Sequence, residues 1–288
     1  MSSPTELADN ALLERIDALY EHDTGDVPDD AAAVFEEFLD RLEGGRLRAA
    51  EPDPSRDGWT VNREVKRGIL FGFRIGELRE FHDDSPLQFS DKHTFPPQRL
   101  PVAERNIRLV PGGSAVRRGA FLGENVTVMP PAYVNVGAHV GADTMVDSHA
   151  LVGSCAQIGD GVHLSSGAQI GGVLEPVGQR PVVVEDDALV GGNTGLYEGV
   201  HVCEGAVIGA GCVVTASTPV YDLPRETVHS PSGGTGATIP PRAVVVPGTR
   251  PASGDFAEQH GVQLSTPVIV KYRDEQTDAQ TALEDALR

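Results

Sequence analysis

One acidic residue, Asp147, stands where a carboxylate could act as a base. It directly follows Val146, which belongs to a row of aliphatic residues that recurs at a constant interval. Because the aliphatic residues of such a row point inward, the side chain of Asp147 should point outward, within reach of a substrate. There it could hold an amine and accept its proton. It could also bond the backbone amides of its own turn, a common use of aspartate, and the residues alone favour this second interpretation.

Metal-ligating residues are present, but their spacing does not indicate a metal site. The histidines of the central region lie at intervals of 10, 14 and 38 residues (His139, His149, His163 and His201). None of these intervals gives the close pair expected of a zinc site at a subunit boundary. The cysteines are odd in number and lack CxxC spacing (Cys155, Cys203 and Cys212). They suggest buried thiols in a reducing compartment, so we expect no metal.

The aliphatic row to which Val146 belongs has an interval of six residues. A branched aliphatic residue stands at every sixth position from 116 to 170, and the row resumes from 184 to 214. Its members are Val116, Leu122, Val128, Val134, Val140, Val146, Val152, Ile158, Leu164, Ile170, Val184, Val190, Leu196, Val202, Ile208 and Val214. A second row, mostly of small residues, runs four positions later, from Ala120 to Ala168 and from Ala188 to Cys212. Such a repeat predicts a solenoid.

The repeat predicts a mainly β fold, a left-handed parallel β-helix over residues 116–250. Each unit forms one short strand and one turn, and three units close a triangular coil. The large aliphatic side chain points inward and stacks on the next coil, as in other solenoids. The sixteen units make about five coils. The interval from Ile170 to Val184 is 14, not a multiple of six, so residues 172–181 must leave the coil as an extruded loop.

Residues 1–95 are expected to form an N-terminal helical domain. Apolar residues share one helical face in 11–20 and in 30–43, and a third helix should start near Asn62. Asp29 or Asp30 could cap the second helix, which the glycines at 44 and 45 would end.

Two further segments complete the predicted organisation. Residues 82–101 are rich in proline, aspartate and serine and indicate a linker, with 96–115 leading into the solenoid. The chain should end in an extension over 251–288, with a strand at 264–273 and a short helix at 277–288. Residues 240–250 could add one last irregular coil.

Composition excludes several function classes. The net charge of −19, from 23 basic and 42 acidic residues, argues against general nucleic-acid binding. No apolar run is long enough to span a membrane, and the first residues do not resemble a signal peptide, so we expect a cytoplasmic protein. The acidity suits a salty cytosol, whose ions screen self-repulsion, better than it suits a basic partner.

A β-helix is a scaffold and does not fix function. Most hexapeptide-repeat β-helices are acyltransferases, some are γ-class carbonic anhydrases, and some are appendages of nucleotidyltransferases. The histidine spacing argues against the carbonic anhydrases. The segment 116–176, with VGSCAQIG and IGGVLEP, resembles the tetrahydrodipicolinate N-succinyltransferases of the lysine and diaminopimelate pathway. The likeness extends to WTVNREVKRGILFGFRIGEL, PPRAVVVPGTRP and VIVKYRDEQT.

This resemblance implies an enzyme, an N-succinyltransferase. Such enzymes move a succinyl group from succinyl-CoA, a co-substrate and not a permanently bound cofactor, to the amine of ring-opened tetrahydrodipicolinate. They are homotrimers with active sites between adjacent β-helices, and the flat faces of a triangular prism suit cyclic packing. The resemblance makes Arg108 a substrate-binding residue, because arginine can clamp a carboxylate with two hydrogen bonds. It makes Asp147 substrate-binding, and we expect Asp147 to be catalytic.

Other residues could assist. Arg117 and Arg118 add positive charge near Arg108 or are merely solvated. Glu175 lies on the loop 172–181, which either covers a neighbouring face and the pantetheine arm or serves only for packing. Small residues that could line a coenzyme A groove are Gly191, Gly192, Ala210 and Gly211. Turn geometry alone explains these glycines better.

One departure affects the mechanism. Many members of the family read GARSEVVEG where this chain reads GGNTGLYEG, so their acid falls at Gly195 and their arginine at Asn193. Either Asp147 suffices, or another acid such as Glu198 substitutes, or acyl transfer needs no second base. Glu198 is more simply interpreted as a turn acid.

Two competing functions remain. The chain could be an acetyl-CoA-dependent relative that acts on a similar amino dicarboxylate, because acyl-chain choice depends on pocket contacts. It could also be a non-catalytic β-helix trimer that has lost activity through the change at Gly195. Arg108, Asp147 and the VLEP loop favour an enzyme.

Overall fold

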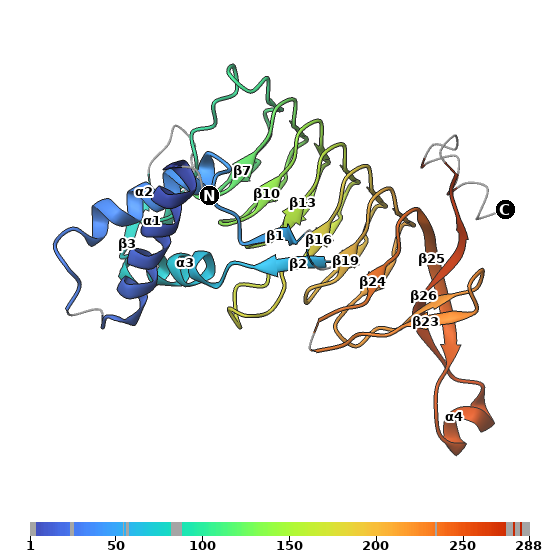
Figure 1. Ribbon diagram of the computed structural model, residues 1–288. Helices are drawn as coiled ribbons and strands as arrows, with labels where there is room; N and C mark the ends of the chain where they lie inside the picture. The colour runs from blue at the N-terminus through green and yellow to red at the C-terminus, as the bar shows by residue number, and fades with distance from the viewer. Residues whose placement is uncertain are drawn as a thin grey trace.

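The computed structural model describes residues 4–23, 26–53, 55, 58–81, 88–233, 235–274, 279 and 283. A three-sided parallel β-helix forms the centre, with a helical region at one end and antiparallel strands at the other (Figure 1). The predicted mainly β solenoid with a helical N-terminal region is confirmed. Among the described residues, no helix has the length and apolar character that a membrane span requires.

The strands of the solenoid are two residues long, and in all of them except the first and last listed below, β5 and β24, the second residue is a member of the predicted aliphatic row. All sixteen members of that row are buried, as is the second row of small residues. The strands are β5 (Arg108–Leu109), β6 (Ala115–Val116), β7 (Phe121–Leu122), β8 (Thr127–Val128), β9 (Tyr133–Val134), β10 (His139–Val140), β11 (Met145–Val146), β12 (Leu151–Val152), β13 (Gln157–Ile158), β14 (His163–Leu164), β15 (Gln169–Ile170), β16 (Val183–Val184), β17 (Leu189–Val190), β18 (Gly195–Leu196), β19 (His201–Val202), β20 (Val207–Ile208), β21 (Val213–Val214) and β24 (Thr238–Ile239).

Strands 18 residues apart pair in parallel and build three sheets, one on each side of the prism. The sheet that runs from β5 through β8, β11, β14, β17 and β20 carries Arg108, and its outer side is called the Arg108 face. The sheet β7–β10–β13–β16–β19–β24 forms the hairpin face, and β6–β9–β12–β15–β18–β21 form the third face. Because the first residue of each strand alternates with a buried aliphatic, it points outward onto one of these faces.

The loop 172–181 leaves the coil between β15 and β16, as predicted. Ile158 pairs with Val184, 26 residues later, so the loop adds eight residues to the usual 18. Its first part turns toward the N-terminal helices, where Val173 is buried. The Nζ atom of the buried Lys66 donates to the carbonyl of Gln179 at 2.5 Å. The loop is therefore held at both ends by its own chain.

Three helices pack on one end of the solenoid: α1 (Pro4–Glu21), α2 (Ala31–Glu43) and α3 (Arg63–Ile75). They confirm the three predicted helices. Their shared core includes Ile16, Phe38 and Ile69, and it continues into Val136 and Cys155 of the coils. Asp30 occupies the N-cap position of α2, but its side chain forms an ion pair with Arg15 and makes no capping hydrogen bond.

Two hairpins correct the prediction that residues 1–95 are helical and 82–101 only a linker. β1 (Ala50–Asp53) pairs with β2 (Gly58–Val61), and β3 (Leu78–Phe81) pairs with β4 (Phe89–Lys92). These strands are only four residues long, and three of the four contain charged residues, with a proline in β1, which hides the alternation that identifies a strand. The β1–β2 hairpin lies on the hairpin face, where Arg48 Nε donates to Gln157 Oε1 at 2.9 Å.

The C-terminal region extends the solenoid into antiparallel strands. β24 pairs with β19 and β25 (Ala243–Pro251) pairs with β20, which confirms the irregular last coil. β25 then pairs with β26 (Gln263–Tyr272), the predicted strand, and α4 (Asp255–His260) connects the two. β22 (Val220–Asp222) and β23 (Thr227–His229) complete this end. The predicted helix at 277–288 lies outside the described residues, apart from Ala279 and Leu283.

Candidate active site

Arg108 and Asp147 come from the same sheet of the solenoid. Arg108 opens β5 and is exposed, and Asp147 directly follows β11 at the corner where the chain turns toward the third face. β8 pairs with both strands, so that Arg108, Thr127 and Met145 lie in one register row. Two strand spacings therefore separate β5, which Arg108 opens, from β11, which Asp147 follows, or about 10 Å along the solenoid axis. The coil thus places two side chains 39 residues apart in sequence on one side of the prism.

The side chain of Asp147 is half-buried and partly engaged in its own turn. Its Oδ1 atom accepts a hydrogen bond from the backbone N–H of Ser148 at 2.7 Å. Its own N–H donates to the carbonyl of Leu164 on the next coil at 2.9 Å, which holds the backbone in place. The amide bond that the sequence suggested as an alternative use of this carboxylate is therefore present. It occupies one lone pair of one oxygen.

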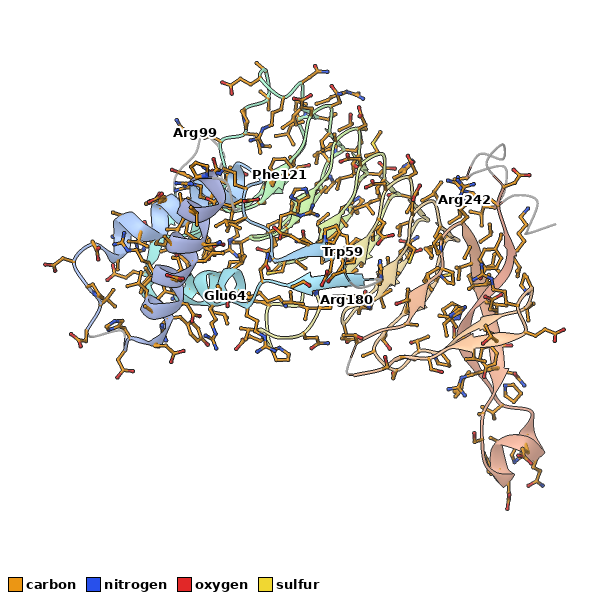
Figure 2. All side chains as sticks on the ribbon, in the orientation of Figure 1. Trp59, Glu64, Arg99, Phe121, Arg180 and Arg242 are labelled. Carbon is orange, nitrogen blue, oxygen red and sulfur yellow. The ribbon has the colours of Figure 1, made fainter. Side chains whose placement is uncertain are left out.

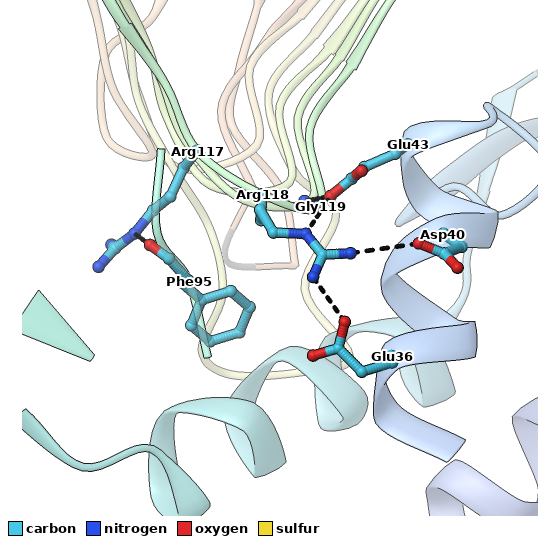
Figure 3. A network of polar contacts seen from close by, with 7 residues as sticks. All are labelled: Glu36, Asp40, Glu43, Phe95, Arg117, Arg118 and Gly119. Atoms are coloured by element: carbon cyan, nitrogen blue, oxygen red, sulfur yellow. Dashed lines mark hydrogen bonds and ion pairs between the residues drawn. The ribbon is translucent and has the colours of Figure 1, made fainter. Parts of the chain in front are cut away.

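Arg117 and Arg118 do not serve as free positive charges beside Arg108. Arg118 donates to Glu43 Oε1 at 2.9 Å and to Glu36 Oε2 at 2.6 Å, both on α2 (Figure 3). Burial opposes its charge, but the hydrogen bonds that Arg118 donates to these carboxylates outweigh that effect and raise the pKa of Arg118. Arg117 donates to the carbonyl of Phe95 at 3.1 Å and pairs with Asp91. Both arginines fasten the N-terminal region to the solenoid.

The acids Glu175 and Glu198 differ in what they contact. Glu175 lies exposed on the extruded loop. Glu198 accepts a hydrogen bond from the N–H of Ala216 at 2.9 Å through Oε2, and its backbone has a positive φ of 43°. Glu198 thus stabilises a turn, which agrees with the simpler of its two interpretations.

At Gly195 the structure shows what occupies the space beside the missing acid. A Cβ atom built there would lie 2.5 Å from Cε2 of Tyr197, and one built at Gly171 would lie 2.8 Å from Cδ1 of the same ring. Tyr197 therefore lies over two glycines on neighbouring coils of the third face. No side chain fits at position 195 unless this ring moves.

The small residues considered for a coenzyme A groove have structural reasons of their own. A Cβ at Gly191 would lie 2.5 Å from the backbone N of Ala210, so the close stacking of two coils requires glycine. Gly211 has a positive φ of 76°, which glycine adopts without strain. Turn and stacking geometry thus account for both.

A large cavity lies at the open end of the solenoid and does not contain the candidate pair. It has a volume of about 1260 Å³ and is lined by residues of the β3–β4 hairpin and the first coil, including Phe89, Leu109 and Arg118. Neither Arg108 nor Asp147 is among the described residues that line it. Within one chain, Arg108 is exposed and Asp147 is half-buried, and this cavity encloses neither.

One group of polar side chains, on the hairpin face, was not predicted from the sequence. Nε2 of His201 lies 2.7 Å from Oε1 of Glu185, and Nε1 of Trp59 donates to the same oxygen at 3.0 Å. Burial alone would raise the pKa of Glu185, but the hydrogen bonds from His201 and Trp59 lower it to about 2. The signal was available, because Glu185 and Cys203 are separated by 18 residues, which is one turn of the coil.

Two family models match the chain. The N-terminal model of tetrahydrodipicolinate N-succinyltransferase matches residues 11–75, and the hexapeptide repeat model of succinyl-transferase matches residues 181–216.

Curated relatives match nearly the whole chain. The 2,3,4,5-tetrahydropyridine-2,6-dicarboxylate N-succinyltransferase of Polynucleobacter asymbioticus is 38% identical over 91% of this chain and 91% of its own length. The proteins of that name from Xylella fastidiosa and Paramagnetospirillum magneticum are 38% and 39% identical, over 97% and 96% of this chain and 98% of their own lengths.

Proposed function

Because the chain belongs to the tetrahydrodipicolinate N-succinyltransferase family, we propose that it transfers a succinyl group to the nitrogen of tetrahydrodipicolinate in the pathway to diaminopimelate and lysine. The observation that carries this proposal is 38% identity with relatives of that name over more than nine-tenths of the chain. The donor that this function requires is succinyl-CoA, a co-substrate that is consumed in each turnover.

In the reaction, the amine nitrogen of the ring-opened substrate attacks the thioester carbonyl carbon of the donor. A carbon–nitrogen bond forms, the carbon–sulfur bond breaks, and the amine loses a proton while the departing thiolate gains one. A base beside the amine accelerates such a step, typically 10²- to 10⁴-fold. We assign this role to Asp147, since its backbone is fixed by the next coil and its Oδ1 atom by Ser148.

Arg108 is assigned to the substrate's carboxylate. The acceptor is a dicarboxylate on a chain whose net charge is −19, so its binding needs a local positive group. Arg108 is exposed and lies about 10 Å from the row of Asp147 along the axis. A substrate that spans the two could place its amine at Asp147 while Arg108 clamps a carboxylate in two parallel hydrogen bonds.

The exposed position of Arg108 supports an active site between chains. A bound acyl-CoA and a small dicarboxylate need walls that exclude water, and the Arg108 face offers only one. The neighbouring prism of a cyclic homotrimer would supply the second wall. A monomeric mass for the active protein, measured by light scattering while the protein turns over its substrates, would contradict this arrangement.

A thiol-release assay tests the function. Purified protein is mixed with succinyl-CoA or with acetyl-CoA, each with and without tetrahydrodipicolinate, and free coenzyme A is measured. We expect release that requires both succinyl-CoA and the acceptor. A preference for acetyl-CoA would favour the acetyl-transferring alternative, and release with neither donor would favour a non-catalytic module.

A substitution at Arg108 tests its assigned role. Arg108→Lys keeps the charge but loses the bidentate geometry, so we expect the KM for the acceptor to rise at least about tenfold while the KM for succinyl-CoA changes little. Arg99→Lys is a matched control on the approach to the solenoid, and an equal effect there would remove the basis for assigning Arg108.

A further inference from the structure

Three side chains with metal-binding atoms meet on the hairpin face, away from the Arg108 face. Glu185 follows β16, while His201 opens β19 and Cys203 follows it. Because Val184 pairs with Val202, the coil places Glu185 beside Cys203. A carboxylate oxygen, an imidazole nitrogen and a thiol sulfur from these residues all lie within 4.8 Å of one another.

The group is sheltered from solvent, and neighbouring residues hold Glu185 and His201 in place. His201 and Cys203 are buried. Trp59, on β2, donates to Glu185 and presents its ring at a steep angle to that of His201, with centroids 6.5 Å apart. The N–H of Glu204 donates to Oε2 of Glu185 at 3.0 Å. Such outer hydrogen bonds orient the ligands of metal sites.

The electrostatic surroundings suit a cation. A cavity of about 300 Å³ adjoins Glu185 under the β1–β2 hairpin. Its lining carries four carboxylates and one guanidinium, from Asp160, Glu185, Asp186, Glu204 and Arg48. An excess of carboxylates around a partly enclosed volume raises the local concentration of cations.

Arg180 is an opposing charge close to the group. It lies near enough to interact with both Cys203 and Glu185, while its side chain donates to the carbonyl of Gly199 at 2.8 Å. Figure 2 shows Arg180 and Trp59 beside the same strands. A positive neighbour favours the thiolate form of cysteine. A divalent ion bound to one thiolate and one carboxylate is then neutral overall, which limits its repulsion by Arg180.

We propose that Glu185, His201 and Cys203 bind a Zn²⁺ ion. Thiolate, imidazole and carboxylate are the three ligand types that zinc takes in proteins. As the ion binds, the thiol of Cys203 gives up its proton to solvent, and so does the imidazole when it is protonated. A water molecule from the adjoining cavity completes four-coordination.

The required movement is small. Tetrahedral zinc with its usual bond lengths spaces its ligand atoms about 3.3 to 3.6 Å apart. Nε2 of His201 would therefore move away from Oε1 of Glu185, from 2.7 Å, and approach Sγ of Cys203, from 3.8 Å. Rotations of the three side chains accomplish this without a change in the coil. The ion would tie two successive coils together beneath the β1–β2 hairpin.

Cobalt is the probe for this site, because Co²⁺ occupies zinc sites and reports its ligands by absorption. The full-length protein is freed of metal with a chelator, titrated with CoCl₂, and then titrated with ZnCl₂. We expect a thiolate-to-cobalt band in the near ultraviolet that saturates at one ion per chain and disappears with zinc. Trp59, the one tryptophan of the chain, should lose fluorescence in the same titration.

Variants locate the ligands. Cys203→Ser should abolish the near-ultraviolet band, whereas Cys212→Ser, which changes a buried thiol of the row of small residues, should keep it. Glu185→Gln should weaken cobalt binding at least tenfold. A single cooperative thermal transition in each metal-free variant, well above the titration temperature, verifies folding, and His201→Asn serves as a second loss variant. Absence of the band in the wild-type protein, or its persistence in Cys203→Ser, would overturn the proposal.

Discussion

The contact between Arg118 and α2 should be a measurable part of the protein's stability. The side chain of Arg118 is 22% exposed, and that of its partner Glu43 is 19% exposed. Substitution by methionine keeps the aliphatic stem but removes the guanidinium. Glu43 then retains, among the contacts described, the N–H of Gly119 at 3.0 Å. The loss should weaken the attachment of the N-terminal region to the first full coil.

The magnitude follows from the exposure of each partner. The bond to Glu43 is partly buried and charge-assisted, so it contributes about 1.5–3 kcal/mol. Glu36 and Asp40 are 57% and 71% exposed, so each pair adds about 0–1 kcal/mol. We therefore expect Arg118→Met to reduce the free energy of unfolding by about 2–4 kcal/mol, which lowers Tm by roughly 5–10 °C.

Thermal unfolding followed by the fluorescence of Trp59 measures this effect, because the tryptophan lies in the β1–β2 hairpin, which connects α2 to α3 and packs on the solenoid. Arg15→Met is the matched control, since Arg15 and Asp30 are 55% and 60% exposed in their ion pair. That variant should stay within about 0.5 kcal/mol of the wild type. Equal Tm values for the two variants would refute the reasoning.

Three further substitutions test the site and its surroundings. Asp147→Asn should lower kcat about 10²- to 10⁴-fold without a change in molecular mass, and near-normal turnover would remove Asp147 as the base. Gly195→Ala should cost about 1–3 kcal/mol, because the new Cβ meets the ring of Tyr197, and Tyr197→Ala in the same chain should recover most of that loss in a denaturant titration. The folded-state pKa of Glu185, about 2, lies below its ordinary value of 4.5, so its stabilising effect is complete above pH 4.5 and is lost as the pH falls toward 2. In chelator-treated samples, Glu185→Gln should therefore be less stable than the wild type by about 2–3 kcal/mol at pH 7, and the two unfolding curves should converge near pH 2.

The N-terminal region shows where prediction from sequence stopped. Its three helices were predicted from apolar periodicity, since an amphipathic helix carries its signal within a dozen residues. The hairpins β1–β2 and β3–β4 carry no such signal. They exist because partners on the solenoid and within the N-terminal region complete them, as the bonds from Arg48 to Gln157 and from Trp59 to Glu185 illustrate.

The candidate site was predictable in part. That Asp147 follows a buried aliphatic residue could be read from the row itself, and Arg108 was named through the family resemblance. Their spacing on one face, two strands apart, needed the register of the coil. The engagement of Arg118 by three acids of α2, at distances of 75 or more residues in sequence, could not be read from local pattern.

By itself, the sequence determined the solenoid: the six-residue rows, the loop at 172–181 and the last irregular coil. In a solenoid each unit contacts only its neighbours, so the length of the sequence repeat predicts the geometry of the coil. Only the tertiary structure decided which charged side chains remain available. Arg118 binds acids of α2, and Arg117 binds Asp91 of β4. Tyr197 fills the space over Gly195, and Glu185, His201 and Cys203 meet under a hairpin. These outcomes depend on contacts between segments far apart in the chain, whose energies are set by burial and distance. Such contacts produce no periodic pattern in the sequence, so the sequence did not predict them.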